Sequence, residues 1–220
     1  MNKSVIIVAG GSGTRMGTEI PKQFLEIGNK PIIVLTIEKF VGIADEIILV
    51  LPRLHFDLWN SIAAQFLLDV NIQMVEGGNT RFQSVANGLK FVKNKESVVA
   101  VHDAVRPFVS KAVIENAYLV AQNEGNAVVS VPLTDSIRKV EAENSFAVNR
   151  SDYRLIQSPQ CFQYSILQEA YLTPEESFFT DDASVVEHAG YKINLVDGEA
   201  INIKITTPFD LKIAATVLQS

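Results

Sequence analysis

Short apolar segments alternate with amphipathic ones over the first two thirds of the chain. The apolar runs at 5–8, 46–51, 72–75, 98–101 and 127–133 are typical of strands buried inside a sheet. Between them, the segments 31–41, 56–67, 81–92 and 111–124 have the composition and apolar spacing of helices. Strands and helices that follow each other in this way predict an α/β domain.

The last third of the chain breaks this alternation. Residues 135–139 and 145–150 are expected to pair as a hairpin arm across a polar turn at 141–144. Helices are expected at 164–171 and 180–190, the second one capped by Thr180, and Pro208 begins a closing helix. The last strands are expected at 196–198 and 202–206. Because an isolated hairpin is marginal in water, the arm at about 135–152 predicts a partner subunit.

Length and composition narrow the class of protein. The chain has 220 residues and no repeat or linker, so we take 1–220 as one domain. A net charge of −6 argues against nucleic acid or an anionic membrane as partner, so an anionic ligand must meet locally placed Lys and Arg. Cys161 is the only cysteine, which suits a reducing compartment. The apolar run at 5–9 is too short for a signal peptide or a membrane span, so we expect a cytoplasmic soluble protein.

A glycine-rich segment follows the first predicted strand. Four glycines between positions 10 and 17 allow backbone N–H groups to come close to a ligand. Arg15 and Lys22 add two cations, which suits a polyphosphate. A plain turn between a strand and a helix is the alternative. No GK[ST] sequence closes the glycines, and Met16 stands where the dinucleotide fingerprint needs Gly or Ala, so neither of these two loops is present.

The segment 76–92 combines a glycine turn with the start of a predicted helix. Gly78 lies in the turn, and Arg81 and Ser84 lie in the first turns of the helix. Such a helix start suits an anion or the edge of a base, and a plain connection between strand and helix is an equally good explanation.

Polar residues also follow the strand predicted at 98–101. Parallel sheets bind ligands at the carboxyl ends of their strands, so Asp103 and Arg106 are candidate site residues. Asp103 can accept a hydrogen bond from a hydroxyl or lie near a magnesium ion. His102 is expected to be a packed residue at the strand end, and no spaced set of histidines indicates a metal site.

Charged residues near the C-terminus leave two interpretations open. Lys204 interrupts the apolar run at 202–206, so its side chain either extends along an apolar surface or points into a site. Asp181 and Asp182 lie in the first turn of the helix predicted at 180–190. Helix capping explains both carboxylates, and a second role in the site is open.

Five motifs together resemble the 2-C-methyl-D-erythritol 4-phosphate cytidylyltransferase family, a branch of the sugar-phosphate nucleotidyltransferases. They are GGSGTRM…PKQF at 10–24, GGNTRFQS at 77–84, HDAVRP at 102–107, DS…QSPQCF at 135–162 and NIKITTP at 202–208. The resemblance implies a mostly parallel, doubly wound, Rossmann-like sheet with a hairpin arm that exchanges across a homodimer. It also implies that the protein joins CTP and methylerythritol phosphate to give CDP-methylerythritol and pyrophosphate, in non-mevalonate isoprenoid biosynthesis.

The same resemblance assigns roles to individual residues. Arg15 and Lys22 are expected to act in catalysis at the α-phosphate and the leaving pyrophosphate, with Mg²⁺ spanning phosphate oxygens. The residues expected to position the polyol phosphate are Arg150 (lent by the partner subunit), Lys204, Asp103, Ser136 and Arg106. Those expected to bind the nucleotide are Ala9, Gly10, Gly11, Gly13, Gly78, Asn79, Arg81 and Ser84. The protein ligands of the metal stay undetermined, with Asp103 a candidate. Asn79 replaces an acidic residue of the family pattern, and Ser136 replaces a threonine.

Other functions compete with this one. Ribitol-5-phosphate cytidylyltransferase shares the glycine loop and HDAVRPF, and Val105 and the segment 206–212 favour it. The Arg-Lys pair at 138–139 and the DDAS sequence at 181–184 favour the methylerythritol enzyme. A non-catalytic nucleotide-binding module is a third possibility, against which the retained cations at 15, 22, 150 and 204 argue. A nicotinamide oxidoreductase is disfavoured because the dinucleotide fingerprint fails.

Overall fold

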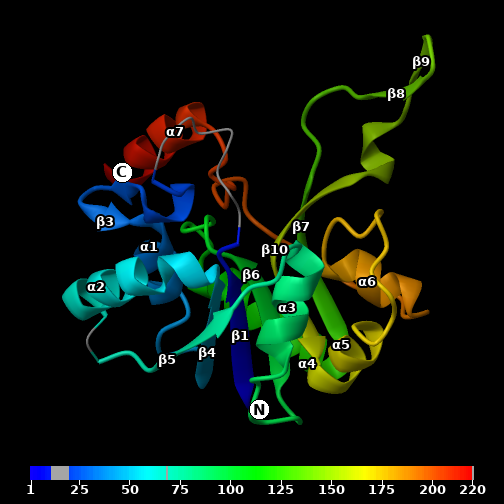
Figure 1. Cartoon of the computed structure of the whole chain (residues 1–220). Helices are drawn as coiled ribbons and strands as arrows, with labels where there is room; N and C mark the ends of the chain where they lie inside the picture. The colour runs from blue at the N-terminus through cyan, green and yellow to red at the C-terminus, as the bar shows by residue number, and fades with distance from the viewer. Residues whose placement is uncertain (11–19, 68, 220) are drawn as a thin grey trace.

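A seven-stranded sheet forms the centre of the protein, with the strand order β11-β7-β10-β6-β1-β4-β5 (Figure 1). The computed structural model describes residues 1–10, 20–67 and 69–219. The strands of the sheet are β1 (Lys3–Val8), β4 (Glu46–Leu51), β5 (Ile72–Glu76), β6 (Val98–Asp103), β7 (Asn126–Pro132), β10 (Arg154–Gln163) and β11 (Leu195–Asp197). Paired strands run parallel, except that β10 is antiparallel to both β6 and β7. The predicted mostly parallel sheet is confirmed.

Helices cover both faces of this sheet, as a doubly wound fold requires. The first face packs against α1 (Ile32–Glu38), α2 (Phe56–Phe66) and α4 (Lys111–Glu124). The second face packs against α3 (Arg81–Leu89), α5 (Tyr164–Ala170) and α6 (Asp182–His188). A smaller apolar cluster joins α7 (Pro208–Gln219) to α1. The short elements are η2 (Lys22–Phe24), β2 (Glu26–Ile27), β3 (Lys30–Pro31), η3 (Arg53–His55), β8 (Arg138–Glu141), β9 (Asn144–Ala147) and η4 (Arg150–Asp152). No helix in the described ranges has the length and apolarity needed to cross a membrane.

The central strands are apolar throughout because their side chains alternate between two cores. In β1, Val5 and Ile7 point into the core under α1, α2 and α4, whereas Ile6 points into the core under α3. On the second face, α3 lies very close to the sheet at Gly88. A Cβ atom at this position would lie 2.8 Å from the Ile6 Cγ2 atom and 2.9 Å from the Val50 Cγ2 atom. The glycine therefore sets how closely α3, which carries candidate site residues at its N-terminal end, approaches β1 and β4.

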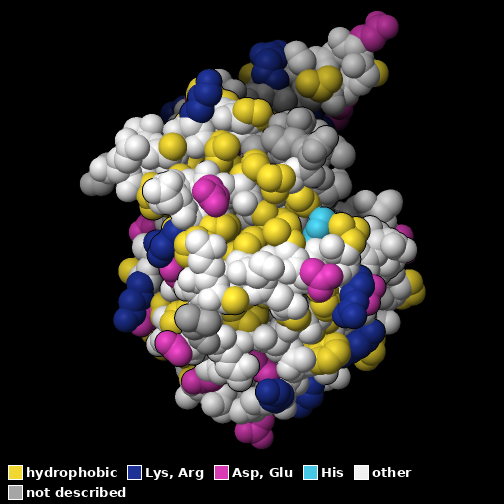
Figure 2. All heavy atoms as spheres, turned by 60° about the vertical axis from the view of Figure 1, so that its left-hand side comes forward, with side chains coloured by type: hydrophobic (Ala, Val, Ile, Leu, Met, Phe, Trp, Pro, Cys, Tyr) yellow, Lys and Arg dark blue, Asp and Glu magenta, His cyan; other side chains and the backbone are white. Residues whose placement is uncertain are grey.

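The predicted hairpin arm is present and projects away from the sheet (Figure 1). It consists of β8 and β9, which pair antiparallel from Arg138 opposite Ala147 to Glu141 opposite Asn144. Hydrophobic side chains lie on its surface among charged ones (Figure 2). Val140 and Phe146 are 71% and 50% exposed. The arm therefore presents apolar surface with no core of its own beneath it.

Most of the predicted elements agree with the structure, and three predictions about the last third need correction. Residues 202–206 form no strand, although the Ile205 N–H donates to the Val105 carbonyl. The segment 154–163, which was assigned no element, is the antiparallel strand β10. The N-cap of α6 is Asp181 rather than Thr180, because the Asp181 carboxylate accepts from the Ser184 N–H.

Candidate active site

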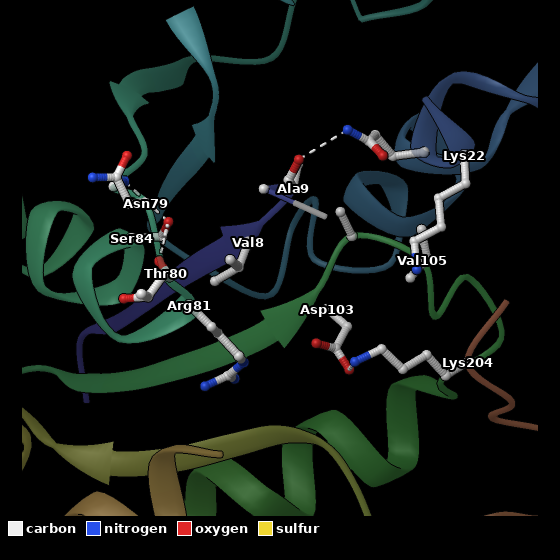
Figure 3. A pocket seen from close by; sticks show the side chains of 14 residues that line it. Val8, Ala9, Lys22, Asn79, Thr80, Arg81, Ser84, Asp103, Val105 and Lys204 are labelled. Atoms are coloured by element: carbon white, nitrogen blue, oxygen red, sulfur yellow. Dashed lines mark hydrogen bonds and ion pairs between the residues drawn. The ribbon is translucent and has the colours of Figure 1, made fainter. Parts of the chain in front are cut away.

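A cavity lies at the carboxyl ends of β1 and β6, which are parallel neighbours in the sheet. Parallel α/β sheets place their ligands at the carboxyl ends of their strands. Its described lining residues are Val8, Ala9, Gly10, Lys22, Gln23, Gly78, Asn79, Thr80, Arg81, Ser84, Asp103, Ala104, Val105 and Lys204. Segments that are far apart in the sequence therefore meet in one cavity, as the close view shows (Figure 3).

One wall of this first pocket is the end of β1 together with η2. The Ala9 N–H donates to the Val50 carbonyl, and the buried Gln23 side chain donates to the Ala9 carbonyl at 2.9 Å. This second bond ties η2, which carries Lys22, to the end of the strand. Lys22 therefore extends into the cavity from a fixed short helix (Figure 3).

The opposite wall is the turn before α3. Ser84 closes this turn, since its hydroxyl accepts from the Gly78 N–H at 3.1 Å and donates to the Thr80 carbonyl at 2.8 Å. The Asn79 N–H donates to the Gln83 side chain at 3.0 Å. A Cβ atom on Gly78 would lie 2.2 Å from the Gln83 Cβ, so only glycine fits here without rearrangement.

The partly buried carboxylate of Asp103 organises the floor of the cavity. The Asp103 Oδ2 atom lies 3.1 Å from the Lys204 Nζ and 3.0 Å from the Arg106 Nε. Burial alone would raise the pKa of Asp103, but the nearby cations, Lys204 foremost, hold it well below its ordinary value. Arg106 also donates to the Asn202 carbonyl at 2.8 Å, which anchors the segment that carries Lys204.

Arg81 is held in place by a second carboxylate, that of Asp182, which is fully buried. Its two terminal nitrogens lie 2.9 Å and 2.5 Å from the two oxygens of Asp182, and the Tyr171 hydroxyl donates to the same carboxylate at 2.6 Å. Burial would lower the pKa of Arg81, but the charge and hydrogen bonds of Asp182 raise it above its ordinary value. Arg81, Asp103 and Lys204 point toward one another from three different segments of the chain (Figure 3).

A second pocket adjoins the first and shares Arg81, Asp103 and Lys204 with it. Its other described lining residues are Arg106, Ile156, Gln157, Ser158, Gln160, Thr180 and Asp181. The Ser158 hydroxyl accepts from the Asp103 N–H at 3.1 Å, and the Gln160 side chain donates to Asp181 at 2.9 Å. The wall shared by the two pockets thus consists of three charged side chains.

Comparisons with known proteins agree on one family. The model of the family IspD, 2-C-methyl-D-erythritol 4-phosphate cytidylyltransferase, matches residues 4–220. The enzyme of that name from Phocaeicola vulgatus is 46% identical over 220 residues, which cover 99% of this chain and all of that protein. This chain belongs to the IspD family.

Solved structures of IspD proteins have the same fold. The 4-diphosphocytidyl-2C-methyl-D-erythritol synthase of Anaerococcus prevotii has a TM-score of 0.87 at 30% identity and covers all of this chain and 96% of its own. The 2-C-methyl-D-erythritol 4-phosphate cytidylyltransferase of Thermus thermophilus has a TM-score of 0.81 at 34% identity, with complete coverage of both chains. The Rossmann-like nucleotidyltransferase fold and the class of enzyme are therefore established. The IspD family is favoured over the two alternatives, a ribitol-5-phosphate cytidylyltransferase and a nicotinamide oxidoreductase.

The structure gathers most of the residues predicted for an IspD site, but not all of them. Of the residues predicted for the site, those that line the first pocket are Ala9, Gly10, Lys22, Gly78, Asn79, Arg81, Ser84, Asp103 and Lys204. Gly11, Gly13 and Arg15 lie outside the described residues. Arg106 lines only the second pocket. Ser136 and Arg150 are exposed and line neither pocket within this chain, and the Arg150 guanidinium donates to the Thr134 carbonyl.

Sequence reasoning gave no site role to several residues of the second pocket. Gln157, Ser158 and Gln160 belong to a motif of the family resemblance, but that resemblance gives them no role in the site. The sequence signal that could have indicated one is the proline within the strand that carries them. The prediction for His102 is confirmed, because it is fully buried, bonds to the Arg106 carbonyl at 3.1 Å and contacts the Phe40 ring.

The described residues contain no cluster that would hold a metal ion by itself. No group of three or more His, Cys, Asp or Glu side chains meets within the described ranges. Asp103 is the one carboxylate among the described lining residues of the first pocket, and two cations already bind it. This arrangement does not fit Asp103 as the centre of a protein-built metal site, but it is compatible with an ion bound mainly by substrate phosphates.

Proposed function

We propose that the first pocket binds CTP, that the second binds 2-C-methyl-D-erythritol 4-phosphate, and that cytidylyl transfer takes place at the wall they share. An oxygen of the methylerythritol phosphate attacks the α-phosphorus of CTP and forms a new P–O bond. The bond from the α-phosphorus to the bridging oxygen breaks, and its electron pair leaves with pyrophosphate. The observation that carries this proposal is the set of charged side chains, Arg81, Asp103 and Lys204, that line both pockets.

The chemistry needs positioned positive charge more than a base. A phosphate monoester is largely ionised near neutral pH, so no residue has to remove a proton from the nucleophile. The obstacle is the approach of two polyanions, which is overcome by orientation and charge stabilisation. Lys22 supports this role from the first pocket and Lys204 from the shared wall. We assign Arg15 to the leaving pyrophosphate together with Lys22.

The walls of the first pocket suit the nucleotide. Ala9, Gly10 and Gly78 allow a ligand to approach the backbone, and Asn79, Arg81 and Ser84 supply polar groups at the start of α3. We propose Gly11 and Gly13 as further backbone donors to the phosphates. Asp103 and Arg106 would position the methylerythritol phosphate, with Asp103 accepting from its hydroxyls.

We propose Mg²⁺ as the metal of the reaction, bound chiefly to phosphate oxygens of CTP. When bound, it would neutralise part of the negative charge on the triphosphate. Cys161 is buried and free, which suits a reducing compartment, and we propose a cytoplasmic location for the enzyme. We also take residues 1–220 to act as one catalytic domain with the arm at about 135–152.

We propose a homodimer in which the arm crosses to the partner. The exposed apolar side chains of the hairpin and of the segment that follows it support this, namely Val140, Phe146, Tyr153, Leu155 and Ile156. Ser136 and Arg150, at the base of the arm, would then complete the second pocket of the partner subunit. Their exposure and their absence from the pockets of their own chain support this assignment.

The proposal is tested by a paired assay of pyrophosphate release. CTP is offered with methylerythritol phosphate or with ribitol 5-phosphate, each with and without Mg²⁺. We expect rapid release with the first acceptor and little with the second. Faster turnover of ribitol phosphate would overturn the choice of substrate, and CTP binding without release from either acceptor would indicate a non-catalytic nucleotide-binding protein.

A further inference from the structure

The transfer chemistry described above gives no task to Asp182, although its carboxylate is the most buried in the site. Asp182 is 0% exposed, and both of its oxygens face the Arg81 guanidinium. The Tyr171 hydroxyl donates to the same carboxylate at 2.6 Å. Tyr171 in turn stacks on Phe82, the residue next to Arg81, with ring centres 4.6 Å apart. Residues 171 and 182 thus fix a side chain of α3 that is about 100 positions away in sequence.

Helix capping does not account for this carboxylate. The cap of α6 is Asp181, which accepts from the Ser184 N–H at 2.9 Å, while the Ser184 hydroxyl accepts from the Asp181 N–H. This capping box satisfies the start of α6 without Asp182. The carboxylate of Asp182 instead accepts from Arg81, which lines both pockets, and from Tyr171.

Stability does not account for it either. The desolvation of two charges offsets most of their attraction, so a buried ion pair adds little over well-packed apolar residues of similar volume. What the pair does provide is orientation. Two parallel N–H···O bonds fix the plane of the Arg81 guanidinium, and the side chain of Arg81 still keeps 30% of its surface exposed.

We infer that Asp182, supported by Tyr171, is a positioning residue for cytidylyl transfer that acts through Arg81. This inference rests on the assignment of the two pockets to the two substrates. Arg81 lines both pockets, so its orientation affects the binding of both substrates. The same pair ties the start of α6, where Thr180 and Asp181 line the second pocket, to the start of α3, which lines the first. The ion pair therefore fixes the position of the two pockets relative to each other.

The first experiment removes the hydrogen bond from Tyr171 and keeps the charged pair of Arg81 and Asp182. Tyr171→Phe deletes one hydrogen bond to Asp182. Tyr191→Phe is the matched control, because the Tyr191 hydroxyl donates to Glu169 at the same 2.6 Å, on the surface and away from the pockets. We expect Tyr171→Phe to lower kcat/KM for both substrates about tenfold, the size expected for one hydrogen bond to a charged group. Tyr191→Phe is expected to match the wild type. Equal activity of the two variants would overturn the inference.

The second experiment replaces the pair as a whole. Asp182→Asn alone would leave the half-buried Arg81 without its carboxylate partner and endanger folding, so Arg81→Met and Asp182→Leu are combined. We expect this variant to fold, as judged by circular dichroism and thermal melting, and to lose on the order of 100-fold in kcat/KM. A folded double variant with activity close to wild type would show that the pair is only structural. If the wild-type enzyme itself showed no turnover, the proposed reaction would be wrong. The role of the ion pair would then be tested by comparing CTP binding in the wild type and the double variant.

Discussion

Replacement of Lys204 by methionine tests the electrostatic account of the site directly. Lys204 is the residue whose ammonium group lies 3.1 Å from the Asp103 carboxylate and faces both pockets. Methionine keeps a long unbranched side chain and removes the charge. The wall shared by the pockets then loses one cation, while Arg106 still binds Asp103 at 3.0 Å.

The two expected effects of this change differ in size. A positioned group that stabilises charge in a transition state contributes on the order of 10²–10³ in rate, so turnover should fall by about that factor. The stability effect should be small, because Lys204 is 40% exposed and solvent screens its ion pair. We expect a loss of about 1–2 kcal/mol in the free energy of unfolding, between the values for exposed and buried pairs. For a chain of this length, this corresponds to a lowering of Tm by about 2–8 °C.

The assay is pyrophosphate release with CTP and methylerythritol phosphate, next to a thermal melt of the same preparation. Lys111→Met serves as the control, because Lys111 forms a loose surface pair with Glu115 at 3.7 Å and lies outside both pockets. The control should keep wild-type turnover. If Lys204→Met lost less than about tenfold in turnover, the charge would not act in the transition state. An activity loss that disappears once the folded fraction is taken into account would refute the reasoning in the same way.

Three further predictions follow from the same contacts. Lys22→Ala should lower turnover by on the order of 10²–10³ without a matching loss of stability, and a near-normal rate would remove Lys22 from the mechanism. Burial lowers the pKa of His102 to about 4 in the folded protein, below its ordinary 6.5. The unfolded chain therefore binds this proton first, and roughly 3 kcal/mol of stability should be lost as the pH falls from about 6.5 to 4, which urea unfolding at several pH values would measure. A flat profile there, with His102 charged by NMR at pH 5.5, would contradict this. In Gly88→Ala, overpacking against Ile6 and Val50 should cost about 1–3 kcal/mol, which outweighs a gain in helix propensity of up to about 1 kcal/mol. The urea concentration at the midpoint of unfolding should therefore fall, and a rise would contradict this.

The sequence predicted those strands whose own residues are apolar, and it failed where a strand depends on its pairing with distant segments. The strands β1, β4 and β6 are apolar on both faces, so their sequences alone predicted them. Strand β10 was not predicted because its sequence, RLIQSPQCFQ, mixes polar residues and a proline, and its pairing with β7 shifts register between Ile156 and Gln160. The opposite error occurred at 202–206, where an apolar sequence suggested a strand. There, Ile205 packs into the cluster beside α7 and no neighbouring strand pairs with the segment.

In the candidate site, too, residues in local motifs could be predicted, whereas contacts between distant residues could not. Lys22, Asp103 and Ser84 could be predicted because each follows a strand or begins a helix in a recognisable motif. The pairing of Arg81 with Asp182 could not be predicted, since nothing near either residue indicates a partner about 100 positions away. For the same reason, the sequence could not decide between helix capping and a role in the site for Asp182, whereas in the structure its neighbour Asp181 performs the capping.

The arrangement of charges explains how a protein with a net charge of −6 can bring two polyanions together. Three cations, Arg81, Arg106 and Lys204, are each bound to one of two carboxylates, the fully buried Asp182 or the partly buried Asp103, before any substrate arrives. Without Asp103 and Asp182, the cations would repel one another and their side chains would spread into solvent. With them, the positive charge is already oriented, so binding requires little rearrangement of the wall. Acidic residues that would repel the substrates in isolation are therefore what keeps the cations in the geometry that the reaction needs.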